Sequence, residues 1–206
     1  MKYLRGKFIV LDGGEGCGKS TQAQLLKDAL EKSSVPTLLV RDPGSTRIGE
    51  MIRKILLDPD HGDFSMRCEM LLYMAARAQL VKELIAPALA EGKCVICDRF
   101  VSSTLAYQLG GDGLTETEIR QAAGIAIANR WPDLTIILDM PVEQSAQRLQ
   151  RARDRIEQRP TEYHQGVRQN YLTQAQKDPA KVKVCPADRE RAAVHLDILK
   201  ILETLK

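Results

Sequence analysis

The chain has 206 residues, of which 44% are hydrophobic and 28% charged, and its formal net charge is +3. This length and balance predict a single globular domain over residues 1–206, and the net charge is too small to indicate a nucleic-acid or membrane partner by itself. No signal peptide and no apolar run of about 18 residues is present, and the five cysteines favour a reducing compartment over a disulfide scaffold. We therefore expect a cytoplasmic protein.

A phosphate-binding loop is predicted near the N-terminus. An apolar run at 7–12 predicts a buried strand, the pattern Gly13-x-x-x-x-Gly18-Lys19-Ser20 follows it, and a helical pattern covers 20–32. The glycines let the loop turn tightly, so backbone N–H groups and the positive helix end can hold phosphate oxygens. Lys19 adds a charge at the β- and γ-phosphates, and the Ser20 hydroxyl can bind Mg²⁺. The residues expected to bind nucleotide are Gly13, Gly14, Glu15, Gly16, Cys17, Gly18, Lys19, Ser20 and Thr21.

Two cysteine features need separate interpretation. Cys17 stands in the loop just before the helix N-terminus, where a thiolate is favoured, so we expect its alkylation to block activity. Cys94 and Cys97 form a C-x-x-C, but they fall inside a predicted strand, where residues three apart point to opposite faces. We expect these two to be buried apolar side chains, not a metal or disulfide site.

Apolar runs alternate with helical patterns along the rest of the chain. Further strands are predicted at 37–41, 93–97, 134–139 and 182–184, and helices at 46–57, 65–91, 102–109, 141–153, 161–176 and 188–206, with another beginning at 115. Pro87 is expected to kink the long helix, and Thr115 with Glu118 has the spacing of a capping box. The pattern predicts an α/β protein with a three-layer P-loop kinase fold, a five-stranded parallel sheet flanked by helices on both faces.

Ligands of such sheets bind beyond the carboxyl ends of the strands. The polar residues at those ends are Arg41-Asp42, Asp98-Arg99, Asp139 and Pro186-Ala187. Asp98 directly follows an apolar strand, as an acid that holds Mg²⁺ does, although a helix cap or turn former takes the same place. Arg99 is placed to grip a phosphate; the alternative is a salt bridge to a neighbouring carboxylate.

An arginine-rich segment at 148–160 separates two predicted helices. Its arginines are Arg148, Arg151, Arg153, Arg155 and Arg159. Charge runs usually form a solvated face, but this one interrupts helices on the binding rim, so we expect a lid that closes over phosphates. Because the loop's variable positions carry no cation, one lid arginine is expected to act as an arginine finger, with Arg155 the first choice. The candidate catalytic residues are Lys19, Arg99, Arg151, Arg153 and Arg155.

Tyr73 and Arg77 lie four residues apart and share one face of the long predicted helix. An aromatic plate beside a fork of donors suits a flat heterocycle that bears carbonyl groups. Spacing alone favours a core tyrosine with a surface arginine, and Thr104 and Tyr107 have the same ambiguity.

Several segments together resemble the thymidylate kinase family over nearly the whole chain, in order and spacing. They are the loop at 13–21, Arg41-Asp42-Pro43-Gly44-Ser45-Thr46, Ala75-Ala76-Arg77, Asp98-Arg99-Phe100 through Ala106-Tyr107-Gln108, and 132–139. The resemblance is to the bacterial kind, in which the lid, not the loop, is rich in arginine. Asp42 and Ser45 depart from the usual Glu and Gly, and Asp112 stands where a base is commoner.

The resemblance implies ATP-dependent phosphorylation of dTMP to dTDP with Mg²⁺, in a homodimer with no nucleic-acid partner. It places Glu15 at the sugar 3′-hydroxyl, Tyr73 against thymine, and Tyr107 against the 2′ position. It implies that Arg77 and Thr104 form hydrogen bonds with the edge of the base and that Arg99 holds the transferring and accepting phosphates. It also places Pro186-Ala187 on the adenine side. The implied substrate-binding residues are Glu15, Asp42, Tyr73, Arg77, Arg99, Thr104, Tyr107 and Gln108, and the implied metal ligands are Ser20 and Asp98.

Other P-loop functions fit less well. A deoxynucleoside kinase needs a carboxylate base for a neutral hydroxyl, whereas a monophosphate acceptor needs only charge clamping, which the arginine content favours. A non-enzymatic nucleotide switch is a further alternative, but no Asn-Lys-x-Asp guanine signature is present, which argues against a GTPase. The small net charge and the lack of a second domain argue against a nucleic-acid-stimulated ATPase.

Overall fold

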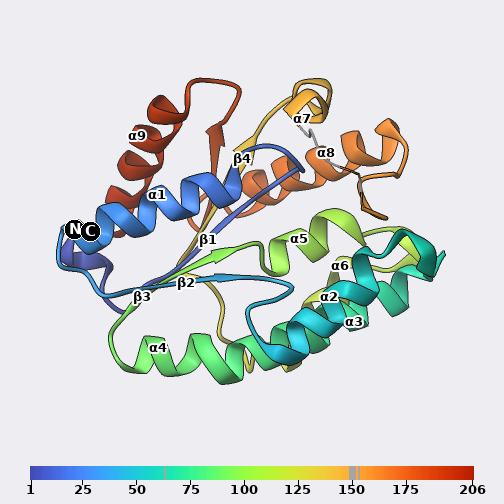
Figure 1. Cartoon of the computed structure of the whole chain (residues 1–206), viewed down its shortest axis with the longest axis horizontal. Helices are drawn as coiled ribbons and strands as arrows, with labels where there is room; N and C mark the ends of the chain where they lie inside the picture. The colour runs from blue at the N-terminus through green and yellow to red at the C-terminus, as the bar shows by residue number, and fades with distance from the viewer. Residues whose placement is uncertain (63, 149–151, 153) are drawn as a thin grey trace.

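The computed structural model describes residues 1–62, 64–148, 152 and 154–206. Within them, parallel strands form one sheet in the order β2-β3-β1-β4-β5 (Figure 1). The strands are β1 Phe8–Gly13, β2 Thr37–Arg41, β3 Cys94–Asp98, β4 Leu134–Asp139 and β5 Val182–Pro186. Strands β1 and β3 are buried along their whole length, because helices cover both faces of the sheet. The predicted fold class is confirmed.

Helices pack on the two faces of the sheet as separate layers. The main helices are α1 Lys19–Lys32, α2 Arg47–Leu57, α3 Met66–Leu80, α4 Ala86–Ala90, α5 Val101–Tyr107, α6 Glu116–Ala126, α7 Val142–Arg148, α8 Thr161–Lys177 and α9 Arg191–Leu202. Helices α1 and α9 cover one face, while α3 to α6 and α8 lie on the other (Figure 1). Short 3₁₀ turns cover Lys2–Leu4, Pro59–His61, Gly111–Gly113 and Glu203–Leu205.

The strand alternation sends neighbouring side chains into different cores. Ile9 packs with α1 and α9, whereas Val10 packs with α3 and α5. Cys94 and Cys97 divide in the same way, one in each core, and both are buried and unpaired. The C-x-x-C prediction is confirmed, because two sulfur atoms on opposite faces of a strand cannot share a metal.

The long predicted helix at 65–91 is continuous but irregular. A π-helical segment at Val81–Ile85 joins α3 to α4, and the Ala86 N–H donates to the Val81 carbonyl five residues earlier. Pro87 has no N–H, and in a regular α-helix its ring would clash with the carbonyl four residues earlier. The wider π turn removes this clash, so the irregularity that Pro87 causes lies in the turn before the proline.

Several helix boundaries differ from prediction, most clearly those of α7 and α9. The described part of α7 covers Val142–Arg148, and Ala152 is not helical, so the predicted helix to 153 is too long; positions 149–151 and 153 lie outside the described residues. The last helix begins at Arg191, not 188, because residues 188 and 189 form a bend and Glu190 has the non-helical angles φ −57° and ψ 138°. Just before this bend, the Ala187 N–H donates to the Asp139 carbonyl at 2.7 Å.

The capping box at the start of α6 is present as predicted. The Thr115 hydroxyl accepts from the Glu118 N–H at 3.2 Å, and the Glu118 carboxylate accepts from the Thr115 N–H at 2.8 Å. We predict that Thr115→Ala lowers the free energy of unfolding by about 1 kcal/mol, measured by urea denaturation, because the Glu118 N–H loses its side-chain acceptor and the Glu118 carboxylate loses the Thr115 hydroxyl. Thr117→Ala, on the exposed part of the same turn, is the control; equal effects at both positions would contradict the cap.

Candidate active site

The glycine-rich loop leaves the carboxyl end of β1 and enters α1, as its sequence requires. Gly13, Gly16 and Gly18 all have positive φ. A Cβ at Gly13 would lie 2.5 Å from the Leu138 carbonyl oxygen, so a larger residue does not fit between the loop and β4. Lys19 begins α1, and its Nζ donates to the Gly13 and Gly14 carbonyls at 3.1 and 2.6 Å. The lysine amine therefore lies in the hollow of the loop.

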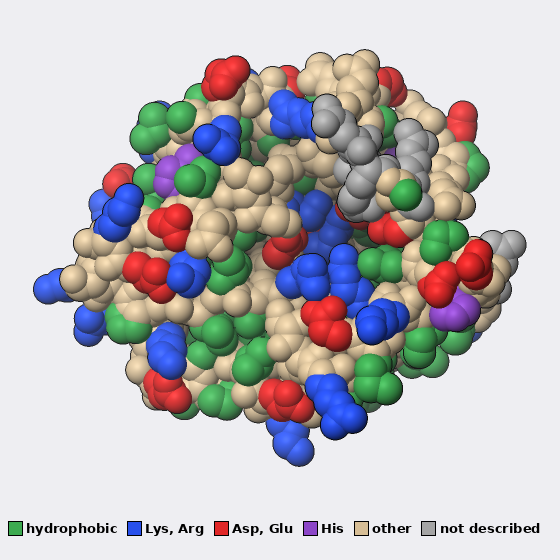
Figure 2. Space-filling model, viewed as in Figure 1, with side chains coloured by type: hydrophobic (Ala, Val, Ile, Leu, Met, Phe, Trp, Pro, Cys, Tyr) green, Lys and Arg blue, Asp and Glu red, His purple; other side chains and the backbone are tan. Residues whose placement is uncertain are grey.

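A cavity that we call the phosphate cavity opens in front of this loop. Its lining is Glu15, Gly16, Gly18, Lys19, Ser20, Thr21, Arg41, Arg53, Leu57, Asp98, Arg99 and Asp154. Figure 2 shows basic side chains gathered in the central hollow of the molecule, as this lining requires. Four cations against three carboxylates make it suited to an anionic ligand.

Ser20 and Asp98 meet at the edge of the phosphate cavity. The Ser20 hydroxyl donates to the Asp98 carboxylate at 2.5 Å, which joins the first turn of α1 to the end of β3. A hydroxyl and a carboxylate are oxygen ligands of the kind Mg²⁺ takes beside substrate phosphates. The described residues contain no group of three or more His, Cys, Asp or Glu side chains that could hold a metal alone. This pair fits a magnesium ion that also coordinates phosphate.

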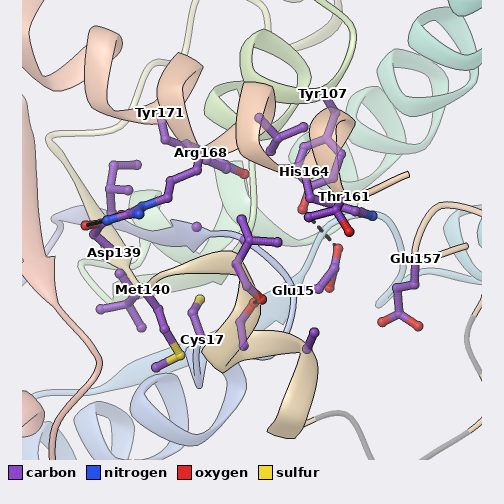
Figure 3. Close-up of a pocket in the computed structure, with 18 of the residues that line it drawn as sticks. Glu15, Cys17, Tyr107, Asp139, Met140, Glu157, Thr161, His164, Arg168 and Tyr171 are labelled. Atoms are coloured by element: carbon purple, nitrogen blue, oxygen red, sulfur yellow. Dashed lines mark hydrogen bonds and ion pairs between the residues drawn. The ribbon is translucent and has the colours of Figure 1, made fainter. Parts of the chain in front are cut away.

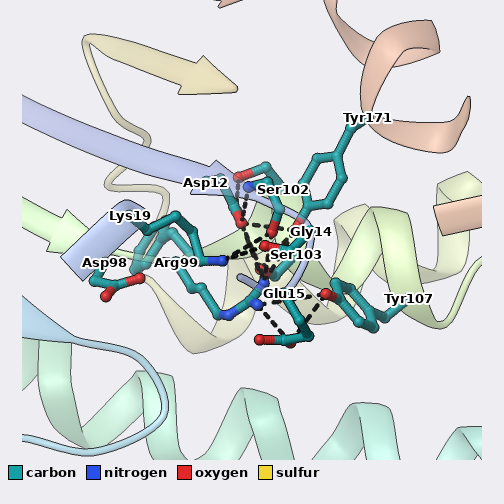
Figure 4. A network of polar contacts seen from close by, with 12 residues as sticks. Asp12, Gly14, Glu15, Lys19, Asp98, Arg99, Ser102, Ser103, Tyr107 and Tyr171 are labelled. Atoms are coloured by element: carbon teal, nitrogen blue, oxygen red, sulfur yellow. Dashed lines mark hydrogen bonds and ion pairs between the residues drawn. The ribbon is translucent and has the colours of Figure 1, made fainter. Parts of the chain in front are cut away.

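Arg99 crosses from β3 to the loop and closes one side of the cavity (Figure 4). Its Nη2 lies 2.5 Å from the Glu15 carboxylate, which also accepts from the Tyr107 hydroxyl at 3.1 Å. Burial alone would raise the pKa of Glu15, but Arg99, Lys19 and Tyr107 lower it to about 2. Arg99 thus forms the predicted salt bridge to a neighbouring carboxylate; it also lines the phosphate cavity, and its grip on a phosphate stays a prediction.

Asp12 is a buried carboxylate beside Arg99, and the sequence did not identify it as a site residue. Its carboxylate accepts from the Ser102, Ser103 and Tyr171 hydroxyls at 2.5, 2.7 and 2.6 Å and lies 3.5 Å from the Arg99 guanidinium. These partners come from α5 and α8, and Tyr171 belongs to no motif. The only sequence feature that could have indicated this role of Asp12 is its position, as an acidic residue at the end of the first buried strand.

A second hollow, which we call the Tyr73 pocket, adjoins the phosphate cavity. The pocket lining brings together Glu15, Asp42, Tyr73, Arg77, Arg99, Thr104, Tyr107 and Gln108, and adds Pro43, Arg53, Leu57, Ser103, Asp154 and Ile156. The expected substrate-binding residues thus share one pocket, although they come from four separate segments.

Arg77 forms a rigid part of the pocket wall and is only 1% exposed. Its Nε donates to Asp42 at 2.5 Å, and its terminal nitrogens donate to the Thr104 hydroxyl and the Phe100 carbonyl at 3.1 and 3.0 Å. Burial raises the pKa of Asp42, and Arg77 opposes that rise. The alternative of a surface arginine beside Tyr73 is therefore wrong.

Arg53 was also missed, and it lines both hollows. It projects from α2, where its guanidinium donates to the Pro43 carbonyl at 3.1 Å, and burial lowers its pKa. Gly49 and Leu56 are the buried residues of α2, and Arg53 shares their face at helical spacing. That spacing is the signal that could have found it.

The lid arginines contact different parts of the molecule. Arg148 donates to the Ala187 carbonyl at 3.4 Å and lines a hollow beside Gly18 on the other side of the loop. Arg155 is 8% exposed and contacts Glu69 and the Leu56 carbonyl, not the phosphate cavity. Arg151 and Arg153 lie outside the described residues. The arginine-finger hypothesis stays a prediction.

Cys17 does not project into the phosphate cavity. Its side chain is 3% exposed and lines a rear cavity behind the loop, together with Asp139, Met140, His164 and Arg168 (Figure 3). Burial raises the pKa of its thiol, with Lys19 acting in the opposite direction. The expected thiolate is therefore wrong, because the loss of hydration outweighs the nearby positive charge.

A glycine-rich loop, a serine–aspartate pair and an adjoining arginine-lined pocket define a P-loop kinase that acts on nucleotides. The model of the family "Thymidylate kinase" matches residues 11–198. Thymidylate kinases of Pelotomaculum thermopropionicum and Exiguobacterium sibiricum are 45% and 40% identical, over 97% and 98% of this chain and 94% and 97% of their own. The crystal structure of thymidylate kinase from Ehrlichia chaffeensis matches with a TM-score of 0.79 and 30% identity, over 95% of this chain and 98% of that one. The chain belongs to the thymidylate kinase family, whose members use ATP to phosphorylate dTMP to dTDP.

The cysteines give a test of the site geometry. We predict that iodoacetamide at neutral pH modifies Cys68, which is exposed, much faster than Cys17, whose thiol is buried and has a raised pKa. Peptide mass spectrometry over a time course measures both rates, and Cys94 serves as a second buried reference. Modification of Cys17 at the rate of Cys68 would contradict the placement of its sulfur behind the loop.

Proposed function

We propose that this chain transfers the γ-phosphoryl group of ATP to dTMP, with ATP at the phosphate cavity and dTMP in the Tyr73 pocket. The observation that supports this is the boundary between the two hollows, which share Glu15, Arg53, Leu57, Arg99 and Asp154. An acceptor phosphate at this boundary would lie between two arginines and face the phosphates held at Lys19. In-line transfer needs this juxtaposition.

The chemistry favours a monophosphate acceptor over a nucleoside. A nucleoside hydroxyl needs a general base, and such a base works best with a pKa near the working pH. Two carboxylates lie at the boundary, Glu15 and Asp154. The pKa of Glu15 is about 2, which makes it a weak base, and the Asp154 Oδ1 already accepts from the Ile156 and Glu157 N–H groups at 3.0 Å. Arg53 and Arg99 instead supply charge for a phosphate that is already nucleophilic.

Lys19 and the magnesium pair supply the donor side. Lys19 would turn from the loop carbonyls to the β- and γ-phosphates when nucleotide binds. Ser20 and Asp98 would hold Mg²⁺, which offsets charge on those phosphates. Arg151, Arg153 or Arg155 would add the finger contact, and for Arg155 this requires leaving Glu69.

The Tyr73 pocket would select the base. Tyr73 offers a ring for stacking, and Arg77, Thr104 and Gln108 offer donors at one wall. Because Asp42 and the Phe100 carbonyl hold the Arg77 fork in place, its orientation costs little on binding. Tyr107, fixed by Glu15 and Arg99, would occupy the space that a ribose 2′-hydroxyl needs.

Assembly and location belong to the same proposal. Helix α2 exposes Ile48, Met51 and Ile55, and the neighbouring α3 exposes Leu71. We propose that this apolar face forms a homodimer. No helix in the described part of the chain has the length and hydropathy to cross a membrane. All five cysteines are free, as proposed for a cytoplasmic enzyme.

An acceptor panel tests the activity. A coupled assay of ADP release should give high turnover with dTMP and little turnover with dCMP or thymidine. For dUMP, kcat/KM should be about 10- to 200-fold lower than for dTMP, because one methyl group is worth about 1–3 kcal/mol.

The loop assignment is tested by a substitution of its lysine. Lys19→Ala should lower kcat by about 10²-fold or more with unchanged circular dichroism. Equal rates with dTMP and dCMP would contradict the pocket assignment, and an active Lys19→Ala enzyme would contradict the loop assignment.

The oligomeric state tests the α2 surface. Light scattering should give the mass of a dimer for the wild-type chain and of a monomer for Met51→Glu, because a charge would be buried in the apolar face. Leu196→Glu on α9 has the same exposure class and should remain dimeric. A monomeric wild-type chain, or dissociation by both substitutions, would overturn this interface.

A further inference from the structure

Glu69 is a buried carboxylate that belongs to neither hollow. It lies on α3, is 0% exposed, and does not line the phosphate cavity or the Tyr73 pocket. It is four residues before Tyr73 and eight before Arg77, so it continues their helix face away from the pocket. A buried carboxylate is costly unless it is fully paired, so its partners show what it does.

Both oxygens of Glu69 are occupied, and the donors come from separate segments. Oε2 accepts from Arg155 at 2.5 Å and from Arg159 at 2.8 Å, and Oε1 accepts from the Gln108 amide at 2.8 Å. Arg155 and Arg159 belong to the lid, whereas Gln108 follows α5 and lines the Tyr73 pocket. One side chain thus connects the lid with the wall of the pocket.

The same contacts fold the second half of the lid over the pocket. Between the two arginines is Ile156, which lines the Tyr73 pocket and is only 3% exposed. The Arg155 N–H and Nε donate to the Leu57 and Leu56 carbonyls at 3.1 and 2.9 Å. These hydrogen bonds fix the position of the lid backbone relative to the end of α2. The charge of Glu69 holds the guanidinium groups of Arg155 and Arg159 in place.

Arg159 adds a second connection to the pocket. Its Nη1 donates to the Tyr163 hydroxyl at 2.5 Å, and that hydroxyl donates to the Tyr107 carbonyl at 2.8 Å. Tyr107 is itself a wall residue of the Tyr73 pocket. Displacement of the lid would therefore disturb the pocket at Gln108 and Tyr107 together.

We propose that Glu69 is a positioning residue that fastens the lid over the Tyr73 pocket and thereby couples lid closure to binding of the acceptor nucleotide. This rests on the proposed assignment of that pocket to dTMP. Glu69 touches no substrate; it acts through Arg155, Arg159 and Gln108. Acceptor binding and lid closure stabilise each other because both depend on the same three side chains.

The test uses Glu69→Gln, which keeps the shape and removes the charge. We expect the dissociation constant for dTMP, measured by calorimetry, to rise at least tenfold while that for ATP changes less than threefold. Hydrogen exchange should accelerate across 154–160, and dTMP should no longer slow it. Glu162→Gln, an exposed acid in the first turn of α8, makes the same charge change and should behave as wild type.

A double substitution separates coupling from general destabilisation. Glu69→Gln with Arg159→Gln should weaken dTMP binding no more than Glu69→Gln alone, because both remove one interaction. Arg159→Gln by itself carries the same test if Glu69→Gln does not fold. Additive effects, or equal weakening of ATP and dTMP binding, would overturn the proposal.

A wild-type control distinguishes this proposal from the function it rests on. If dTMP slows exchange at 73–77 and 154–160 in the wild type but acts identically in Glu69→Gln, then the pocket assignment stands and the role of Glu69 is wrong. If dTMP does not protect 73–77 in the wild type, the pocket assignment itself is wrong, and the proposal fails with it.

Discussion

The ion pair between Arg99 and Glu15 holds the centre of this molecule together. Arg99 follows β3 with a positive φ of 72°, an uncommon backbone conformation for a side chain of its size, and its N–H donates to the Leu11 carbonyl of β1 at 3.0 Å. That conformation directs the guanidinium across the loop to Glu15, with Asp12 and Tyr107 at its sides. Strands, loop and covering helices therefore meet at one cation.

This arrangement balances charge where phosphates are to bind. Glu15 and Asp12 offset Arg99 within the protein, while Lys19 is satisfied by loop carbonyls. Carbonyl groups are weaker partners for a cation than phosphate oxygens, so Lys19 is more readily given up to a nucleotide than Arg99 is. Arg99 remains anchored by its carboxylates, and it can meet a phosphate with little reorganisation.

The parts of the site that could be predicted best from the sequence are those whose conformation is determined by residues adjacent in the chain. The loop from Gly13 to Ser20 carries its own conformation in its glycines, and parallel strand order places Asp98 beside it. Tyr171 and Arg53 were missed because their roles depend on packing between distant segments. Tyr171 reaches Asp12 across 159 positions, and no local pattern records such a contact.

The lid shows the same limit more sharply. The density of arginine between 148 and 160 predicts anion contacts, but local sequence cannot say whether the anion is a ligand or a side chain. Glu69 lies 86 and 90 positions before its two arginine partners, inside a helix that otherwise reads as an ordinary amphipathic segment. The buried Glu69 carboxylate changes how the arginine-rich segment is interpreted. It binds the guanidinium groups of Arg155 and Arg159, so these two arginines contact a side chain of the protein and not a ligand.

The division of the lid has a consequence for how the two substrates are enclosed. Arg148 lies by the loop and β5, whereas Arg155 and Arg159 are fixed to α3, so the ends of one segment contact opposite sides of the site. A segment anchored this way cannot move as one rigid flap, because shifting one end requires breaking buried ion pairs at the other. Within the described residues of the segment, Arg155 and Arg159 are held by ion pairs with the buried Glu69 carboxylate, whereas Arg148 donates a hydrogen bond to the Ala187 carbonyl at 3.4 Å. On the proposed assignment of ATP to the phosphate cavity and dTMP to the Tyr73 pocket, the Arg148 end therefore moves at a lower cost than the end held at Glu69, because a carbonyl is a weaker partner for a guanidinium group than a buried carboxylate.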